Sequence, residues 1–387
     1  MNILHALTAT LLSVLLSITM TVGAFFATTI PQIAHQTLPT PTTTRKTPTD
    51  IFPFAQDIKT LTEASSTKQS DTKIVKISNT LPIKPPLKTP GSAPISSQTK
   101  TPNQLNTLTR AALVNILCTT RAGGSFNPLS GSGILITGNG VILTNAHVAE
   151  YLLLRDYPTP GNTDCVVRMG SPAEPLYRAS LLYLPSEWME TNAKKIATEG
   201  ATSTGENDYA FLLITSTTNG GPLPTPPAGG FPFVPITTDQ PAPKDAAFIA
   251  AYPAQYLGGI EIQKNLYASS VYSTVQELFG FQETNPSVDL FSLAGSVVSQ
   301  TGSSGGAVAR PQDGTLEGIV ATEGEGATTA DRTLYAITLG HIDRSLKASG
   351  HGGIIPLLSG DVGQKVLDFN TNIAPSLTKK LVDVLDK

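Results

Sequence analysis

Beyond residue 110 the chain is divided into short runs of apolar and β-branched residues, each bounded by Gly, Pro or Asn. Many short strands separated by turn residues are typical of an all-β sandwich or barrel. The 33 Gly and 30 Pro among 387 residues argue against a helical bundle. We expect few helices, at 186–198, 340–348 and 376–385. The expected strands lie at 111–119, 133–137, 141–144, 165–169, 209–215, 246–252, 266–275, 288–293, 316–322 and 333–338.

The first 30 residues contain no Asp, Glu, Lys or Arg. Residues 3–30 are longer than the about 20 apolar residues that span a hydrocarbon core. Two interpretations fit: a cleaved signal peptide with its apolar core at 7–22, or a retained transmembrane anchor. The lack of Lys or Arg before the apolar run weakens the first. We predict an exported protein, either membrane-anchored outside the cytoplasm or secreted, with residues 1–30 as its point of membrane association.

Residues 31–105 have a different composition, with 15 Thr and 11 Pro. Such a segment cannot bury enough apolar surface to offset its chain entropy, which predicts a disordered linker. It holds 9 basic and 4 acidic residues. The lysines either keep the linker solvated or favour an anionic surface. The net charge of the whole chain is −3, which indicates no nucleic-acid partner.

Three motifs in the β-rich region carry chemically active side chains. The first is Leu143-Thr144-Asn145-Ala146-His147-Val148, which places a histidine directly after an apolar strand. The second is Asn207-Asp208-Tyr209-Ala210, with one carboxylate at the start of a strand. The third is Gly302-Ser303-Ser304-Gly305-Gly306, a serine in a glycine-rich turn. Together they supply a nucleophile, a base and an acid.

These residue types point to nucleophilic acyl transfer. A serine hydroxyl needs an adjacent base, and the base needs a third group that fixes its tautomer. We assign Ser304 as nucleophile, His147 as base and Asp208 as the acid that orients it. The backbone N–H groups of Gly302 and Ser304 would form the oxyanion hole. No metal or cofactor is needed for this chemistry.

On these motifs the chain resembles the chymotrypsin/trypsin-like serine proteases, closest to their bacterial trypsin-like, Deg-type branch. The resemblance covers roughly 110–350 and the order His, Asp, Ser is that of the family. It implies two six-stranded antiparallel β-barrels with the site between them, and hydrolysis of peptide bonds in a polypeptide substrate. The implied organisation is a protease domain at 106–350 followed by a tail with a short helix at 351–387. No PDZ domain is expected.

The resemblance also suggests a specificity pocket. Residues 296–301 would line one wall and Ala321–Glu323 the other, with Val298 at the base, Ala321 and Glu323 being the main candidates on the second wall. An apolar base predicts no preference for Lys or Arg. Ser303 stands where animal digestive members carry an Asp that binds a new N-terminus, so zymogen activation of that kind is not expected.

Two cysteines, Cys118 and Cys165, fall in predicted strands of the first barrel. They form either one disulfide, as suits an exported domain, or two buried thiols. Two cysteines exclude a four-cysteine zinc site.

Two rival functions remain open at this level. Gly302-x-Ser304-x-Gly306 also matches the nucleophile elbow of α/β-hydrolases, in which Asp313 or Asp331 and His341 or His351 could complete an esterase triad. We otherwise expect these two histidines to be surface groups. The other rival is a protease-fold binding or scaffold protein without activity.

Overall fold

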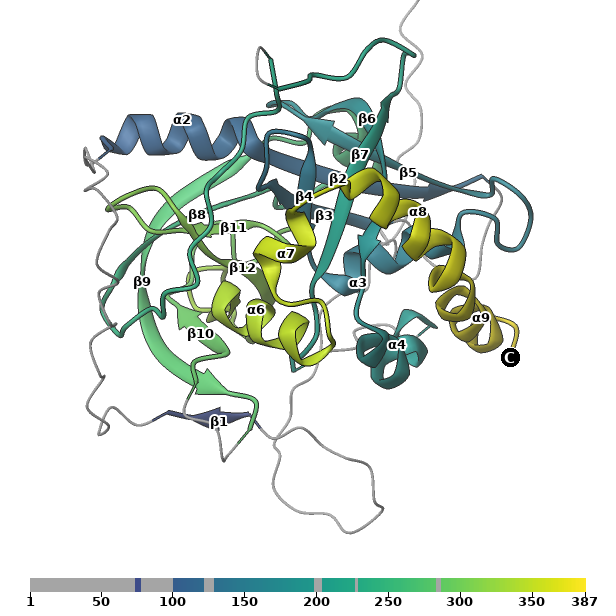
Figure 1. Ribbon diagram of the computed structural model, residues 1–387. Coiled ribbons are helices and arrows are strands. Elements are labelled where there is room, and N and C mark those ends of the chain that lie inside the picture. The colour runs from purple at the N-terminus through teal and green to yellow at the C-terminus, as the bar shows by residue number, and fades with distance from the viewer. Residues whose placement is uncertain (1–73, 78–99, 122–128, 198–203, 227–228, 283–286) are drawn as a thin grey trace, which may run out of the picture. The chain divides into compact units, whose positions relative to one another are not determined.

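The computed structural model describes residues 74–77, 100–121, 129–197, 204–226, 229–282 and 287–387 (Figure 1). The predicted N-terminal helix at 1–30 and most of the predicted linker lie outside these residues. Among the residues that the structure describes, no helix is both long and apolar enough to cross a membrane.

The first barrel is closed and entirely antiparallel. Its strands pair in the order β2-β3-β4-β7-β6-β5, so that β2 contacts both β3 and β5. The core includes the fully buried strand β4 and the inward-facing residues of β7. The six strands are β2 (Leu113–Thr120), β3 (Leu129–Leu135), β4 (Val141–Thr144), β5 (Thr163–Met169), β6 (Glu174–Tyr183) and β7 (Ala210–Thr217).

A second antiparallel barrel follows in the chain. It closes in the order β8-β9-β10-β13-β12-β11 through the pairing of β8 with β9. Its strands are β8 (Ala246–Ala251), β9 (Ser269–Gly280), β10 (Leu290–Leu293), β11 (Ala307–Ala309), β12 (Leu316–Glu323) and β13 (Leu334–Thr338). The short strand β1 (Val75–Lys76) adds to β9 near its C-terminal end. The prediction of two six-stranded β-barrels is confirmed.

One disulfide joins neighbouring strands of the first barrel. Cys118 on β2 and Cys165 on β5 face each other in the strand register, with Cα atoms 4.0 Å apart. Of the two alternatives open in the sequence, the structure contains the disulfide.

Helices precede the first barrel, connect its strands and those of the second, and follow the second barrel. Helix α2 (Pro102–Ala112) begins inside the predicted linker, because Thr101 and Gln104 form a capping box and a proline occupies the first turn. Between the strands lie α3 (Ala146–Ala149), the 3₁₀ helix η1 (Glu150–Leu154), α4 (Ser186–Asn192), the 3₁₀ helix η2 (Ala193–Ala197), α5 (Gly259–Lys264) and α6 (Leu339–Ala348).

The C-terminal tail differs from the single short helix that we expected. It holds α7 (Ile354–Leu358), α8 (Val362–Asn372) and α9 (Ala374–Leu385). Helix α8 packs against β6, and α9 packs against η1, α4 and η2 (Figure 1). An apolar stripe that includes Phe369, Leu377 and Leu381 is buried against the first barrel, which explains why these segments are helical. The tail is therefore part of the domain that carries His147.

Candidate active site

His147 lies where β4 ends and α3 begins. Asn145, two residues before His147, is the N-cap residue of α3, and its side-chain amide donates to the backbone carbonyl of Asp208 over 2.8 Å. Strand β4 is fully buried and paired with β3 and β7, so the position of His147 is fixed by the barrel. The imidazole is 32% exposed. It is thus rigidly held and still open to a substrate.

Asp208 orients this ring. Its Oδ2 lies 2.8 Å from Nδ1 of His147, and its Oδ1 accepts from the backbone N–H of His147 over 3.1 Å. Asp208 is only 2% exposed, so water competes little for these bonds. The contact at Nδ1 keeps a proton there and leaves Nε2 as the free basic nitrogen.

The electrostatics of His147 favour proton uptake. Burial by itself lowers the pKa of His147, but the charge of Asp208 and its hydrogen bond to the ring outweigh this effect. The charge of Glu150 acts in the same direction, and the net pKa of His147 is raised above its ordinary value. A base with this environment can accept a proton from a hydroxyl and later return it.

Ser304 lies in the loop that precedes β11, and the first barrel holds this loop in place. The backbone N–H of Ser132 donates to the carbonyl of Ser304 over 2.8 Å, and the Ser132 hydroxyl donates to the carbonyl of Gly302 over 2.8 Å. The same hydroxyl accepts from the N–H of Tyr252 over 2.9 Å. Fully buried on β3, Ser132 therefore links the two barrels at the nucleophile loop.

Glycine is required at two positions of this loop. Gly302 has φ +94° and Gly305 φ +82°, in the left-handed region. A Cβ on Gly305 would lie 2.1 Å from the carbonyl oxygen of Ser132, and one on Gly302 would lie 2.7 Å from that of Tyr252. The glycines of the third motif thus permit both the turn and the close contact between barrels.

The predicted oxyanion donors are available. Among the residues that the structure describes, the N–H groups of Gly302 and Ser304 have no hydrogen-bond partner, whereas those of Ser303 and Gly305 donate to Gln300 and Val320. Within the same part of the chain, the Ser304 hydroxyl makes no hydrogen bond to the ring of His147. Such bonds are often long in substrate-free enzymes and shorten when a substrate is bound.

The predicted pocket residues have mixed environments. Val298 is fully buried and belongs to the apolar core of the second barrel, while Ala321 is 2% exposed. Glu323 forms an ion pair of 3.4 Å with Arg332, a residue that the sequence analysis did not single out. The Arg332 guanidinium also contacts the carbonyl of Ser299 over 3.4 Å. The pocket assignment stays a prediction.

Two further residues beside His147 were missed. Glu150 is 4% and Trp188 2% exposed, and the indole N–H donates to Glu150 Oε2 over 3.1 Å. The Trp188 and His147 rings lie 6.4 Å apart between centroids. The spacing of three residues between His147 and Glu150, about one helical turn, was the only sequence signal for this arrangement.

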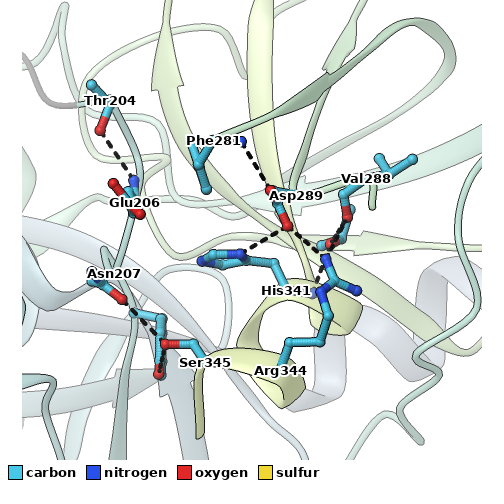
Figure 2. A network of polar contacts seen from close by, with 11 residues as sticks. Thr204, Glu206, Asn207, Phe281, Val288, Asp289, His341, Arg344 and Ser345 are labelled. Carbon is cyan, nitrogen blue, oxygen red and sulfur yellow. Dashed lines mark hydrogen bonds and ion pairs between the residues drawn. The ribbon is translucent and has the colours of Figure 1, made fainter. Parts of the chain in front are cut away.

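Helix α6 braces the turn that precedes Asp208 (Figure 2). The Ser345 hydroxyl donates to Asn207 Oδ1 over 3.1 Å and accepts from the Tyr209 hydroxyl over 2.9 Å. One turn earlier on α6, His341 Nδ1 lies 3.0 Å from Asp289 Oδ1. We expected His341 to be a surface group, and this was wrong. The His341 side chain is only 9% exposed, and its ring is paired with Asp289, which directly precedes β10 of the second barrel.

The α/β-hydrolase alternative does not fit this architecture. Those enzymes need a largely parallel sheet with helices on both faces, whereas every pairing between the named strands is antiparallel. His341 is engaged with Asp289. Among the described residues, no group of three or more His, Cys, Asp or Glu could hold a metal ion.

Comparison with known proteins gives the family. Residues 131–319, which include all three motifs, match the family described as a trypsin-like peptidase domain. Residues 131–319 therefore form a trypsin-like peptidase domain. No curated protein sequence matches it.

Several solved proteases are similar to this peptidase at low identity. The active form of the Rv3671c protease of M. tuberculosis is 18% identical, with 69% of this chain and 93% of that chain covered and a TM-score of 0.38. The serine endoprotease of Yersinia pestis is 20% identical, covering 65% and 68%, with a TM-score of 0.39. Deg5 is 16% identical, covering 64% and 92%, with a TM-score of 0.39.

Proposed function

We propose that this peptidase cleaves peptide bonds inside polypeptides through a Ser304–His147–Asp208 triad and an acyl-enzyme intermediate. The observation that carries the proposal is the His147–Asp208 pair, 2.8 Å between Nδ1 and Oδ2, in the barrel that also anchors the loop of Ser304 through Ser132. A purely structural role seldom requires a buried carboxylate, an accessible imidazole and an anchored serine together.

The first half-reaction follows from these roles. Ser304 Oγ forms a bond to the carbonyl carbon of the substrate while Nε2 of His147 takes the hydroxyl proton. The oxyanion receives hydrogen bonds from the N–H groups of Gly302 and Ser304, two donors of this loop that have no partner among the described residues. When the C–N bond breaks, His147 returns the proton to the leaving amine.

The second half-reaction repeats the steps with water. His147 removes a proton from the water as its oxygen bonds to the acyl carbon, and the Ser304–carbon bond then breaks with the proton passing back to Ser304. Asp208 stays ionised and stabilises the imidazolium in both halves. No group outside the chain and the substrate is consumed except water.

Active-site labelling of the full chain with a fluorophosphonate, mapped by mass spectrometry, tests this proposal. We expect one label, on Ser304, and loss of labelling in His147→Ala and Ser304→Ala. Ser303→Ala is the matched control, because the Ser303 hydroxyl is buried one residue away and has no hydrogen-bond partner in the part of the chain that the structure describes. If folded wild-type protein is not labelled, the chain is a protease-fold binding protein instead.

We also propose that the protein works outside the cytoplasm. Two observations support this: residues 1–30 carry no charged side chain, and the domain contains a disulfide, which persists in oxidising compartments. Fractionation of producing cells, with protease protection of the intact membrane fraction, tests it. Recovery of the reduced protein from the cytoplasm would contradict the proposal.

A further inference from the structure

We propose that Glu150 and Trp188 form a positioning pair for His147, in which the indole holds a second carboxyl beside the histidine and so sets the orientation and electrostatic environment of its ring. The inference rests on the proposed function, because it matters for catalysis only if His147 is the general base.

The pair lies beside His147. Glu150 begins η1, one turn after His147, and Trp188 comes from α4, a separate element. Trp188 contacts both: its Nε1 lies 3.1 Å from Glu150 Oε2, and its ring centroid is 6.4 Å from that of His147. With exposures of 4% and 2%, neither side chain has much access to water. Burial of a carboxyl costs free energy, and the bond from the indole offsets part of that cost.

The C-terminal helix keeps both elements in place. The Thr378 hydroxyl of α9 donates to the carbonyl of Leu153 in η1 over 3.2 Å. Lys380 of α9 forms an ion pair with Glu190 of α4 over 3.1 Å. Helix α9 thus contacts the two segments that supply the pair, and Figure 1 shows it lying beside α4. The positions of Glu150 and Trp188 are therefore fixed from outside the triad.

The charges around the pair make it sensitive to protonation. Burial raises the pKa of Glu150 to about 8, while the bond from Trp188 and the charge of His147 oppose this rise and the charge of Asp208 adds to it. Besides His147 and Asp208, the titratable groups in reach are Tyr151, whose own pKa is raised by burial and by Glu150, and Lys195, which interacts with Asp208.

Ionisation of Glu150 in turn acts on His147. Its negative charge raises the pKa of His147, so the two groups titrate as a coupled pair. Glu150→Gln keeps an oxygen that can accept from Trp188 but removes the charge. In this variant the pKa of His147 should fall, and the acid limb of the pH profile of kcat/KM should move to lower pH.

Trp188 provides a readout that does not depend on activity, because it is the only tryptophan in the chain. In the full-length wild type we expect a fluorescence transition near pH 8 that Glu150→Gln lacks. NMR titration of the His147 ring should show the lower midpoint in the same variant. Glu187→Gln is the control: it removes an exposed acid from the same helix as Trp188, one that makes no hydrogen bond or ion pair with α9 in the described residues, and should change neither midpoint.

Three results would overturn the inference: no fluorescence transition in the wild type, the same transition in Glu150→Gln, or an unchanged His147 titration in that variant. Trp188→Phe removes the donor and should raise the midpoint of Glu150, seen in the His147 titration as a second step at higher pH. If Ser304 is not labelled while both titrations behave as expected, the proposed function is wrong, but the inferred effect of Glu150 and Trp188 on His147 still holds.

Discussion

Removing the disulfide should destabilise the domain by about 4 kcal/mol. The perturbation is the double variant Cys118→Ala, Cys165→Ala. The two residues are 47 apart in sequence, and the loop-closure entropy of a cross-link at that separation is worth about 4 kcal/mol at 25 °C. The native state loses little, because both residues already face each other in the ladder between β2 and β5. The effect therefore acts mainly on the unfolded chain.

Urea unfolding followed by the fluorescence of Trp188 measures this difference. The variant should unfold at lower urea with a larger m-value, since its unfolded chain is less compact. Wild type unfolded in a reductant is the control, and it should match the variant apart from a small cost for the cavity at Cys118, which is 1% exposed. A loss below about 1 kcal/mol, or two thiols titrated by Ellman's reagent in denatured, unreduced wild type, would refute the reasoning.

Three further predictions follow from single residues. Asp208→Asn replaces the acceptor at Nδ1 of His147 by an amide, and should slow peptide hydrolysis by about 10⁴-fold without changing the urea midpoint. Gly305→Ala should abolish labelling of Ser304, because the new Cβ would collide with the carbonyl oxygen of Ser132. The free energy of unfolding should fall by more than about 1–2 kcal/mol, the cost of placing a non-glycine residue in the left-handed region. Burial raises the pKa of Glu317 to about 7 from 4.5, so the native state binds this proton more tightly than the unfolded chain. The contribution of Glu317 to stability should fall by about 3 kcal/mol between pH 4.5 and 7, and in urea unfolding at pH 5 and 8 the Glu317→Gln variant should show a smaller pH dependence than the wild type.

The sequence was informative where a residue's neighbours in the chain determine its role. Glycines around Ser304 mark a turn with positive φ, and the apolar run before His147 marks the end of a buried strand; both properties are local. Ten of the twelve barrel strands were predicted near their observed positions for the same reason, since apolar runs and turn residues act over a few positions, whereas β6 and β11 were missed. The barrel count came from the family resemblance, because strand pairing between distant segments leaves no local pattern.

Contacts between distant residues were beyond this reasoning. The bond from Trp188 to Glu150 joins residues 38 apart, and His341 pairs with Asp289 across 52 residues. A lone histidine in an amphipathic helix looks the same whether its ring faces water or a buried aspartate. The tail was underestimated because its helices are stabilised by burial against β6 and η1 rather than by their own propensity.

The location of the proposed triad makes the proposed catalysis depend on how the two barrels are joined. His147 and Asp208 belong to the first barrel and Ser304 to the loop before β11 of the second, so neither barrel alone contains the site. Several buried side chains connect them. Tyr252, which follows β8, donates from its hydroxyl to the carbonyl of Gly170 over 2.7 Å, and two more come from strands of the first barrel. Ser132 bonds to the nucleophile loop, and Arg168 of β5 reaches α5 with a hydrogen bond of 2.7 Å to the carbonyl of Ile262.

These two links differ in what they control. Ser132 contacts the loop that carries Ser304 itself, so a shift there moves the nucleophile and the oxyanion donors together. Arg168 is anchored by Asn115 in the first barrel over 2.8 Å and binds the segment between β8 and β9, away from the reacting groups. Loss of the Arg168 side chain leaves the buried amide oxygen of Asn115 and the carbonyls of Ile262 and Gln263 without this donor. We expect this to lower the free energy of unfolding before it changes the geometry of the site. Loss of the Ser132 hydroxyl leaves the carbonyl of Gly302 and the N–H of Tyr252 without this partner, which also costs stability, while the backbone bond to Ser304 remains. Ser132 on β3 thus acts on the position of the loop that carries the proposed nucleophile, and Arg168 on β5 acts on the contact between the barrels.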